Sequence, residues 1–421
     1  MIHEFQYRNG ELFCEQVKVA DVVKKAGTPL YLYSHTMIID HFRKVRDAFA
    51  PVKPVVCFAM KANSNMAILK ALAKAGAGFD VVSGGELKKV LKVGAEPKKI
   101  VFASVGKTVQ EIETAVKTGI LFFNVESAQE LERIQDVCAR LRKKQRVSLR
   151  MNPDVDPHTH SFITTGHKAS KFGMDIRTVE GLLRRHREFP NLILGGLHIH
   201  IGSQILEARP FQQAIKKALA VIARARKNGV RIDTLNIGGG LGIIYKKETP
   251  QTAAQYAAKV LPLLKRSGLR VILEPGRFIV GNSGILLTRV LYLKESHSRQ
   301  FAIVDAGMND LIRPSLYGAY HEIRPISRNG TFSKKTRYDV VGPVCESGDF
   351  FAKNRPLPVL KSGAVLAVFG AGAYGFTMSS NYNSRPRAAE VLVKGASWYL
   401  IRQRERIEDL FRGEQIPSFL R

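Results

Sequence analysis

The sequence predicts an α/β protein made of a (β/α)8 barrel of the TIM type and a second, mostly antiparallel β domain. The chain has 421 residues, which is more than one ordinary hydrophobic core serves, so we expect two domains. Short apolar segments alternate with amphipathic ones through the first two-thirds of the chain, whereas strand-like segments dominate the last third. The first pattern is typical of parallel strands covered by helices, and the second of an antiparallel sheet.

The barrel prediction depends on a count of strands. Eight segments rich in Val, Ile and Phe lie at 54–61, 79–83, 100–104, 121–125, 147–152, 194–202, 234–240 and 271–276. Amphipathic segments lie between them, for example at 65–75, 85–93, 109–118 and 128–143. Eight strand–helix units in about 250 residues match a closed barrel. A doubly wound sheet is the alternative. The strand count and the polar residues that follow the strands favour the barrel, which we assign to residues 28–277.

The β domain is predicted from both ends of the chain. Strand-like segments separated by turns lie at 284–296, 301–307, 337–344 and 364–374. Near the N-terminus, residues 5–17 have the pattern of a hairpin that turns at Asn9-Gly10, a dipeptide favoured in two-residue turns. We therefore expect residues 1–27 and 278–421 to form this domain, with the charged residues 402–421 at its periphery.

Composition narrows the class of protein. No apolar run approaches the roughly 20 residues that cross a bilayer, and the first residues lack the layout of a signal peptide. The four cysteines, Cys14, Cys57, Cys138 and Cys345, are scattered without the spacing of a metal site or a disulfide framework. These features predict a cytoplasmic protein with free thiols, no membrane partner and no bound metal.

The net charge is +29, and a protein this basic could bind nucleic acid. Its basic residues form small groups interleaved with acids at helical spacing, as on solvated helix faces. No recognition helix, zinc finger or aromatic RNA-binding platform accompanies them. We therefore expect no nucleic-acid partner.

Polar residues and glycines follow most of the predicted barrel strands. In chain order they are Lys61, Asp80, Ser83, Asn152, His198, His200, Ser203, Gly238, Gly239, Gly240, Glu274 and Arg277. The active site of such a barrel lies at the carboxyl ends of its strands, so we expect these residues to gather. A lysine, a carboxylate, an imidazole and a glycine turn in one place suit a phosphorylated cofactor that the lysine holds as a Schiff base.

Each of these residues also has a purely structural interpretation. A lysine after a strand is usually solvated, and three glycines in a row could form only a tight turn. Alternatively, the glycine N–H groups bind phosphate at the start of a following helix. His198 and His200 alternate along one predicted strand, so one is expected to face the barrel interior and the other to face outward.

The motifs around these residues resemble a known family. CFAMKANSN at 57–65 resembles the lysine motif of the alanine-racemase-like, fold-III pyridoxal-phosphate decarboxylases. Further motifs are similar, in the same order, to the diaminopimelate decarboxylase family, at 78–87, 150–174, 197–205, 235–243, 273–277, 311–323, 340–351 and 371–393. The resemblance extends from about residue 9 to about residue 393. It departs at Ala364, where the family often has an acid, and in the strong positive charge.

The resemblance implies a role for each site residue. Pyridoxal 5'-phosphate would be bound covalently by Lys61, with Asp80 also at the cofactor, His200 stacked on the pyridine ring and Glu274 paired with the ring nitrogen. The phosphate would be held by Ser203, Gly238, Gly239, Gly240, Gly276, Arg277 and Tyr374. The substrate would be held by Arg277, Arg313, Tyr317, Glu346 and Tyr374. Cys345 would be the proton donor, so Lys61, His200 and Cys345 form the expected catalytic set.

The reaction implied by the resemblance is decarboxylation of meso-2,6-diaminopimelate to L-lysine and carbon dioxide, the last step of lysine biosynthesis. The resemblance also implies a homodimer with composite sites, in which Cys345 and Glu346 reach the Lys61 site of the partner. An ornithine, arginine or carboxynorspermidine decarboxylase is the nearest alternative, against which Arg313 with Tyr317 and the Cys-Glu-Ser motif at 345–347 argue. A racemase would need a second base, and a non-enzymatic cofactor-binding protein would lack the β domain.

Overall fold

The computed structural model describes residues 4–156, 171–328 and 335–420. The chain divides into two compact units, a barrel unit of Ile38–Ile279 and a β unit of Met1–Met37 with Val280–Arg421. This division lies later in the sequence than the boundaries that we expected at residues 28 and 277. The reason at the N-terminal boundary is strand β4 (Leu30–Ser34), which pairs with β13 and β19 of the β unit.

The barrel unit contains a closed ring of eight parallel strands. They are β5 (Val55–Ala59), β6 (Gly78–Val81), β7 (Ile100–Phe102), β8 (Phe122–Val125), β9 (Gln145–Arg150), β10 (Leu192–His198), β11 (Thr234–Asn236) and β12 (Arg270–Leu273). Consecutive strands are neighbours, and β12 closes the ring on β5. All eight predicted strands and the barrel itself are thus confirmed.

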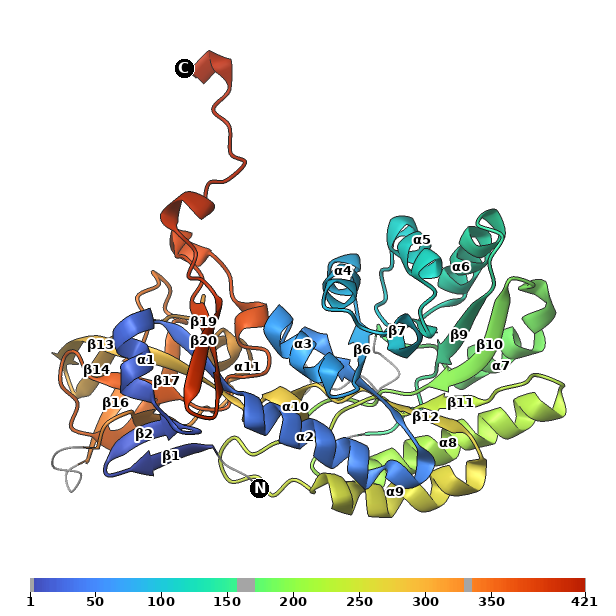
Figure 1. Cartoon of the computed structure of the whole chain (residues 1–421), viewed down its shortest axis with the longest axis horizontal. Helices are drawn as coiled ribbons and strands as arrows, with labels where there is room; N and C mark the ends of the chain where they lie inside the picture. The colour runs from blue at the N-terminus through green and yellow to red at the C-terminus, as the bar shows by residue number, and fades with distance from the viewer. Residues whose placement is uncertain (1–3, 157–170, 329–334, 421) are drawn as a thin grey trace. The chain divides into compact units, whose positions relative to one another are not determined.

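Helices lie outside the ring of strands (Figure 1). They are α2 (His35–Ala48), α3 (Met66–Lys74), α4 (Gly84–Lys92), α5 (Val109–Thr118), α6 (Ala128–Arg140), α7 (Ile176–Arg184), α8 (Arg209–Lys227) and α9 (Ala253–Ser267). The four predicted helices correspond to α3–α6. Helix α6 ends before its predicted end at residue 143, because Arg142 has φ 52° and turns the chain. Polar caps fix several helix starts. Ser83 is one of them, since its side chain accepts the N–H of Glu86.

The β unit is built on a nine-stranded sheet, which confirms the predicted second domain. Besides β4 it contains β13 (Gly284–Ser296), β14 (Arg299–Val304), β15 (Ile323–Pro325), β16 (Lys335–Val341), β17 (Phe350–Pro358), β18 (Val365–Val368), β19 (Ala389–Lys394) and β20 (Ser397–Arg402). Most pairs are antiparallel, whereas β14–β16 and β4–β19 are parallel.

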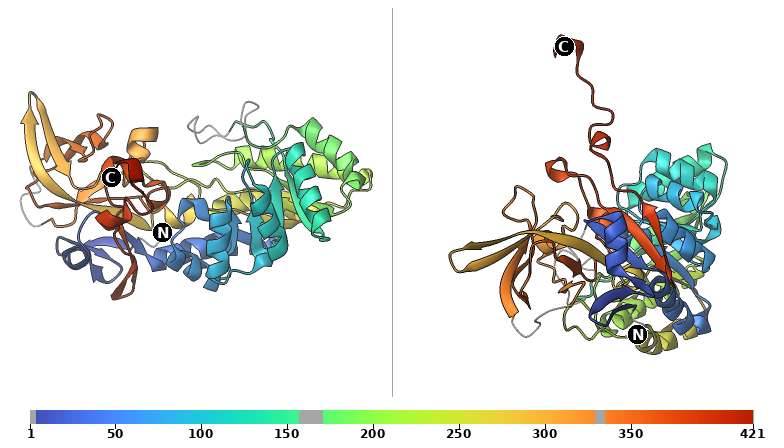
Figure 2. Two further views of the ribbon diagram at one scale, coloured as in Figure 1. Left: turned by 90° about the horizontal axis from the view of Figure 1, so that it is seen from above. Right: turned by 60° about the vertical axis from the view of Figure 1, so that its left-hand side comes forward.

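The N-terminal hairpin forms as predicted but not inside this sheet. Strands β1 (Phe5–Arg8) and β2 (Glu11–Cys14) join through Asn9-Gly10, and β3 (Val17–Lys18) completes a separate three-stranded sheet. Helix α1 (Val19–Ala26) follows, and apolar side chains of this segment share one core with those of β4 and β19. At the other end, residues after β20 leave the sheet as a largely exposed segment (Figure 2). In the described part of the chain no helix is long and apolar enough to cross a membrane.

Candidate active site

Lys61 and Asp80 form the first pair of the candidate site. Lys61 lies in a short 3-10 helix (Met60–Ala62) directly after β5, and Asp80 lies within β6. The Lys61 Nζ donates a hydrogen bond of 2.8 Å to Asp80 Oδ2. The Asp80 side chain is fully buried, whereas 36% of the Lys61 side chain is exposed. An amine held at the carboxyl end of a barrel strand and still open to solvent is well placed to react with a small molecule.

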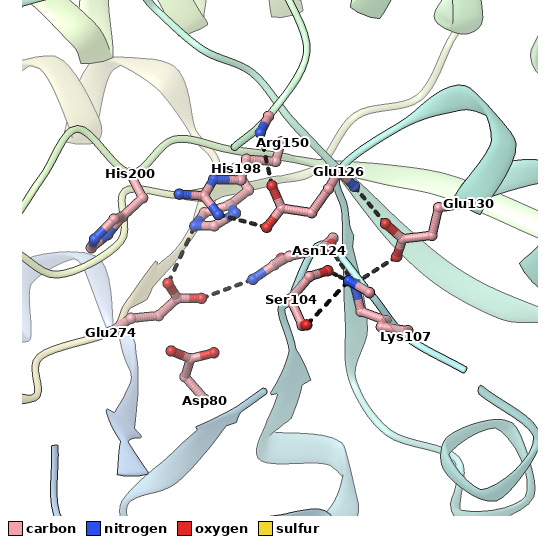
Figure 3. A network of polar contacts seen from close by, with 12 residues as sticks. Asp80, Ser104, Lys107, Asn124, Glu126, Glu130, Arg150, His198, His200 and Glu274 are labelled. Carbon is pink, nitrogen blue, oxygen red and sulfur yellow. Dashed lines mark hydrogen bonds and ion pairs between the residues drawn. The ribbon is translucent and has the colours of Figure 1, made fainter. Parts of the chain in front are cut away.

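Glu274, directly after β12, is the centre of a buried polar cluster (Figure 3). Its Oε1 accepts hydrogen bonds from the side-chain amides of Asn124 (2.9 Å) and Asn236 (2.6 Å). Its Oε2 lies 3.2 Å from Nε2 of His198. Burial alone would raise the pKa of Glu274, but His198, Lys61 and the Asn236 amide outweigh it and hold that pKa well below the usual range. The carboxylate is therefore ionised.

The carboxyl group of Asp80 differs from that of Glu274. Burial, helped by the nearby Glu274 anion, raises the pKa of Asp80 to about 6, although the Lys61 cation beside it acts in the opposite direction. Asp80 Oδ1, Asn124 Oδ1 and His198 Nδ1 are buried and have no hydrogen-bond partner among the described residues. Unsatisfied polar atoms are costly inside a protein. A polar ligand bound in the barrel mouth could form hydrogen bonds with these atoms beside Glu274.

The two histidines both adjoin the site, so the expectation that one faces outward is wrong. Strand β10 ends at His198, and the alternation of a strand does not continue to His200. The ring Nδ1 of His200 accepts the N–H of Gly239 at 3.3 Å. Enclosure by protein lowers the pKa of His200 well below its usual value, and the cations Arg150 and Lys61 lower it further. The ring is therefore neutral, as its acceptor role requires.

The glycine run after β11 allows close packing of the strand ends. A Cβ on Gly239 would lie 2.1 Å from the carbonyl oxygen of Glu274, and Gly240 has φ 108°. The N–H of Gly238 donates to Asn236 Oδ1 at 2.9 Å. Helix α9 begins only at Ala253, so the expectation of a helix start after the glycines is wrong. The chain instead crosses the barrel end as an irregular connection.

Arg277 lies after Gly276, at the first residue of α10 (Arg277–Val280). Its Nε and Nη2 each lie 3.2 Å from Ser203 Oγ, to which they donate. Its Nη1 donates a 2.6 Å hydrogen bond to the hydroxyl of Tyr245. Ser203 and Arg277, both predicted from the sequence, are thus in contact. Tyr245, which also contacts Arg277, was not predicted.

A second buried network lies beside this cluster (Figure 3). Lys107, with no exposed side-chain surface, donates to Glu130 at 2.6 Å. The other Glu130 oxygen accepts the N–H of Glu126, and the Glu126 side chain pairs with Arg150 at 2.5 Å. The two cations of this network, Lys107 and Arg150, therefore balance the two glutamates in charge. Asn152, also nominated, donates its N–H to the Met174 carbonyl.

The remaining nominated residues lie in the β unit, where three segments come together. Arg313 and Tyr317 bound helix α11 (Arg313–Tyr317), and Arg313 Nη1 donates to His321 Nε2 at 3.1 Å. Ser315 Oγ donates to the Gly348 carbonyl, which joins α11 to the loop of Cys345 and Glu346.

That loop is joined in turn to the segment after Tyr374. The N–H of Cys345 donates to Asn383 Oδ1 at 2.7 Å. Cys345 and Glu346 are exposed, and Tyr374 is half-buried with φ 56°. The β unit thus joins helix α11 to the loop that carries Cys345 and Glu346, while the roles of these residues stay predictions.

Comparison with known proteins identifies the family. The model of the pyridoxal-binding domain of pyridoxal-dependent decarboxylases matches residues 35–281. A diaminopimelate decarboxylase of Pseudomonas aeruginosa is 48% identical over 412 residues, which cover 98% of this chain and 99% of that protein. The chain belongs to the diaminopimelate decarboxylase family. As a member of this family, the protein is a decarboxylase that depends on pyridoxal phosphate.

Two solved members of the diaminopimelate decarboxylase family share the whole fold. The Helicobacter pylori enzyme, complexed with L-lysine, has a TM-score of 0.90 and 42% identity, covering 94% of this chain and 98% of its own. The enzyme from M. jannaschii, also with L-lysine, has a TM-score of 0.94 and 35% identity, covering 99% and 98%. The barrel and the sheet unit are therefore the family's architecture.

Proposed function

We propose that this protein catalyses the decarboxylation of meso-2,6-diaminopimelate to L-lysine and carbon dioxide. The observation that carries the proposal is the barrel mouth, in which the reachable amine of Lys61 and the buried, ionised carboxylate of Glu274 lie at the ends of neighbouring strands β5 and β12. Relatives named diaminopimelate decarboxylase match almost the entire chain, which favours this substrate over ornithine or arginine.

The residues of the barrel mouth fit pyridoxal phosphate. Lys61 supplies the amine that would bind the cofactor covalently, beside Asp80. The Glu274 carboxylate would hold a proton on the ring nitrogen, and the neutral His200 would lie against the ring face. When bound, the cofactor supplies a protonated ring that accepts the electrons left on the substrate carbon as carbon dioxide departs.

The phosphate would be held by hydroxyls, backbone N–H groups and a cation. Ser203 and Arg277 are already in contact at the barrel end. A side chain on Gly239 would collide with the Glu274 backbone, and Gly240 has a positive φ, so only glycines let the chain pass this close to the strand ends. The remaining phosphate ligands in this proposal are Gly238, Gly276 and the hydroxyl of Tyr374.

Substrate selection would depend on arginines. Arg277, Arg313 and Tyr317 would bind the carboxylate that does not react, because a guanidinium can make a paired, charge-assisted contact with it. Glu346 would take the distal ammonium of the substrate, Tyr374 would also contact the substrate, and the Cys345 thiol would give its proton to the reacting carbon. Lysine or ornithine, offered as a substrate, lacks the second carboxylate. Each would leave buried cations unpaired and so be rejected.

We further propose that the protein is a cytoplasmic homodimer with composite sites. Cys345 and Glu346 are exposed in the single chain, as expected of residues that complete a site on a second copy. Two-fold symmetry would generate two equivalent sites of this kind. All four cysteines are free thiols, which is typical of a reducing compartment.

The test measures lysine release from meso-diaminopimelate by the purified protein loaded with pyridoxal phosphate. We expect carbon dioxide and L-lysine in equal amounts, and little turnover of L-lysine or L-ornithine.

Borohydride reduction of the loaded protein should fix the cofactor on the peptide that contains Lys61. The Lys61→Ala variant should lose this label, whereas Lys74→Ala, which alters an exposed lysine of α3, should keep it. Equal turnover of L-ornithine, or a label on another lysine, would contradict the proposal.

A further inference from the structure

The guanidinium of Arg277 is fixed by side chains from two different connections of the barrel. Ser203, after β10, accepts from the Nε and Nη2 nitrogens at 3.2 Å each. Tyr245, in the connection between β11 and α9, accepts from Nη1 at 2.6 Å. The two hydroxyls thus engage all three nitrogens of the planar group. Turning the guanidinium about its last side-chain bonds would break at least one of these hydrogen bonds.

Tyr245 is itself held in place by its own segment. The Glu248 Oε2 atom accepts the N–H groups of Tyr245 (2.9 Å) and Lys246 (2.6 Å). Burial would raise the pKa of Glu248, but these backbone N–H groups outweigh it and lower that pKa. The carboxylate is therefore ionised and closes the turn that carries the tyrosine.

The same connection is tied to the end of β10. The Gln204 side chain donates to the Ile243 carbonyl at 2.6 Å and accepts the Ile243 N–H at 3.1 Å. Ser203 and Tyr245 thus approach Arg277 from two segments that are themselves hydrogen-bonded to each other. These hydrogen bonds hold the segment that carries Tyr245 and thereby help to fix the position of its hydroxyl.

Orientation matters because an arginine recognises a carboxylate through a planar fork of N–H groups. A fork held in advance loses less entropy on binding than one that must be ordered by the ligand. A phenylalanine at position 245 would keep the ring near the guanidinium, whose Cζ lies 5.9 Å from the ring centroid. It would remove the hydroxyl that accepts the Nη1 hydrogen.

We propose that Tyr245 is a positioning residue that sets substrate preference, by holding Arg277 in the orientation that binds the non-reacting carboxylate. The inference rests on the function proposed above for Arg277. Tyr245 has no role in bond cleavage or in covalent attachment of the cofactor. Its loss should therefore weaken the binding of amino-acid ligands that carry this carboxylate more than the binding of amines that lack it.

The test compares Tyr245→Phe with the parent holoenzyme. The KM for meso-diaminopimelate should rise about tenfold, on the order of one hydrogen bond to a charged group, while kcat stays within about twofold. Two competitive inhibitors separate the causes. L-Lysine retains the non-reacting carboxylate, and its inhibition constant should rise with KM. 1,5-Diaminopentane has no carboxylate, and its inhibition constant should not change.

Two further variants complete the test. Tyr292→Phe removes a hydroxyl from an exposed tyrosine of β13 and should match the parent. Glu248→Gln should shift KM in the same direction as Tyr245→Phe but less, because a neutral amide holds the turn more weakly. The inference is overturned if Tyr245→Phe matches the parent, if both inhibitors weaken equally, or if kcat alone falls. A parent enzyme that releases no lysine overturns the proposed function instead.

Discussion

Glu274 and His198 meet inside the barrel, with 3.2 Å between Oε2 of the carboxylate and Nε2 of the imidazole. The other carboxylate oxygen takes two amide hydrogens from Asn124 and Asn236. These groups come from strands β8, β10 and β11 and from the end of β12. Three side chains thus stabilise the charged form of one buried carboxylate. Burying a charge is unfavourable for folding, so we infer that this charge has a function.

Replacing Glu274 by glutamine removes the negative charge of the side chain and keeps its size, so the variant tests the role of the charge. The amide keeps an oxygen that can accept from Asn236, but it cannot hold a proton on the cofactor ring. We expect kcat to fall by on the order of 10²-fold, as when other charge-stabilising groups are removed from active sites. Cofactor content, read from the absorbance spectrum, should stay near that of the parent. Glu113→Gln, which alters a solvent-facing glutamate of α5, should leave kcat unchanged. A Glu274→Gln enzyme of normal kcat would refute the assignment.

The buried pair Lys107–Glu130 offers a stability prediction with an internal control. The same Nζ–Oε1 distance, 2.6 Å, occurs in the exposed pair Lys117–Glu113. Lys107→Met should lower the free energy of unfolding by about 3–5 kcal/mol, because Glu130 is left buried and unpaired. Lys117→Met should change it by less than about 1 kcal/mol. Urea unfolding followed by circular dichroism measures both.

The double variant Lys107→Met/Glu130→Gln distinguishes the cause of that loss. If the unpaired charge of Glu130 is responsible, neutralising it should restore part of the stability, so the double variant should unfold at higher urea than Lys107→Met alone. If the double variant is no more stable than Lys107→Met, the loss arises from the carbonyls of Ser104 and Asn124 that Lys107 also contacts.

The fold was predictable to the extent that its signals are local. Each barrel strand is a short run of buried apolar residues, and these runs are visible without knowing their partners. Strand β4 has the same appearance, with every residue from Leu30 to Ser34 buried, and its assignment to the barrel segment was wrong for that reason. Its partners β13 and β19 follow some 250 residues or more later in the chain, and local pattern carries no information about such pairing.

The candidate site was predictable where polar residues end apolar strands, as at Lys61 and Glu274. Asn124 and Asn236 were missed although each is a buried amide within an apolar strand, a signal that could have revealed them. Tyr245 was missed because it lies in an irregular connection without periodicity. Its approach to Arg277 depends on the pairing of strand ends, which no single segment encodes.

Asp310 should make stability depend on pH. Burial raises the pKa of Asp310 to about 7, against the Gly307 N–H and the cations Arg385 and Arg404, which lower it. The folded chain therefore holds a proton that the unfolded chain releases near pH 4. The parent should lose stability as pH rises from about 4 to 7, because burying the ionised form is unfavourable.

The Asp310→Asn variant removes this dependence. Its amide oxygen can still accept the Gly307 N–H, which now reaches Asp310 Oδ2 at 3.0 Å. We expect the variant and the parent to be alike near pH 4 and the variant to be more stable at pH 8, by up to about 4 kcal/mol. Thermal unfolding across this range provides the measurement, with Asp136→Asn, at an exposed position of α6, as the control. A difference that does not change with pH would show that the carboxyl of Asp310 titrates normally.

Subunit complementation tests the proposed composite site. Lys61 lies in the barrel unit and Cys345 in the β unit, and the proposal assigns them to one site drawn from two chains. Lys61→Ala and Cys345→Ala should each be inactive as pure dimers. In a mixed dimer, one site would collect both defects and the other would have neither.

Random mixing should therefore restore about a quarter of the parent activity, because half of the dimers are mixed and each has one intact site. Lys61→Ala mixed with Glu274→Ala is the matched control. Both of these residues lie in the barrel unit, so no mixed dimer of this pair contains an intact site and no activity should return. Exchange of subunits is verified independently with two differently tagged chains. If mixed dimers of the Lys61→Ala and Cys345→Ala variants form and remain inactive, each chain builds its own site, because intact Lys61 and intact Cys345 never then meet.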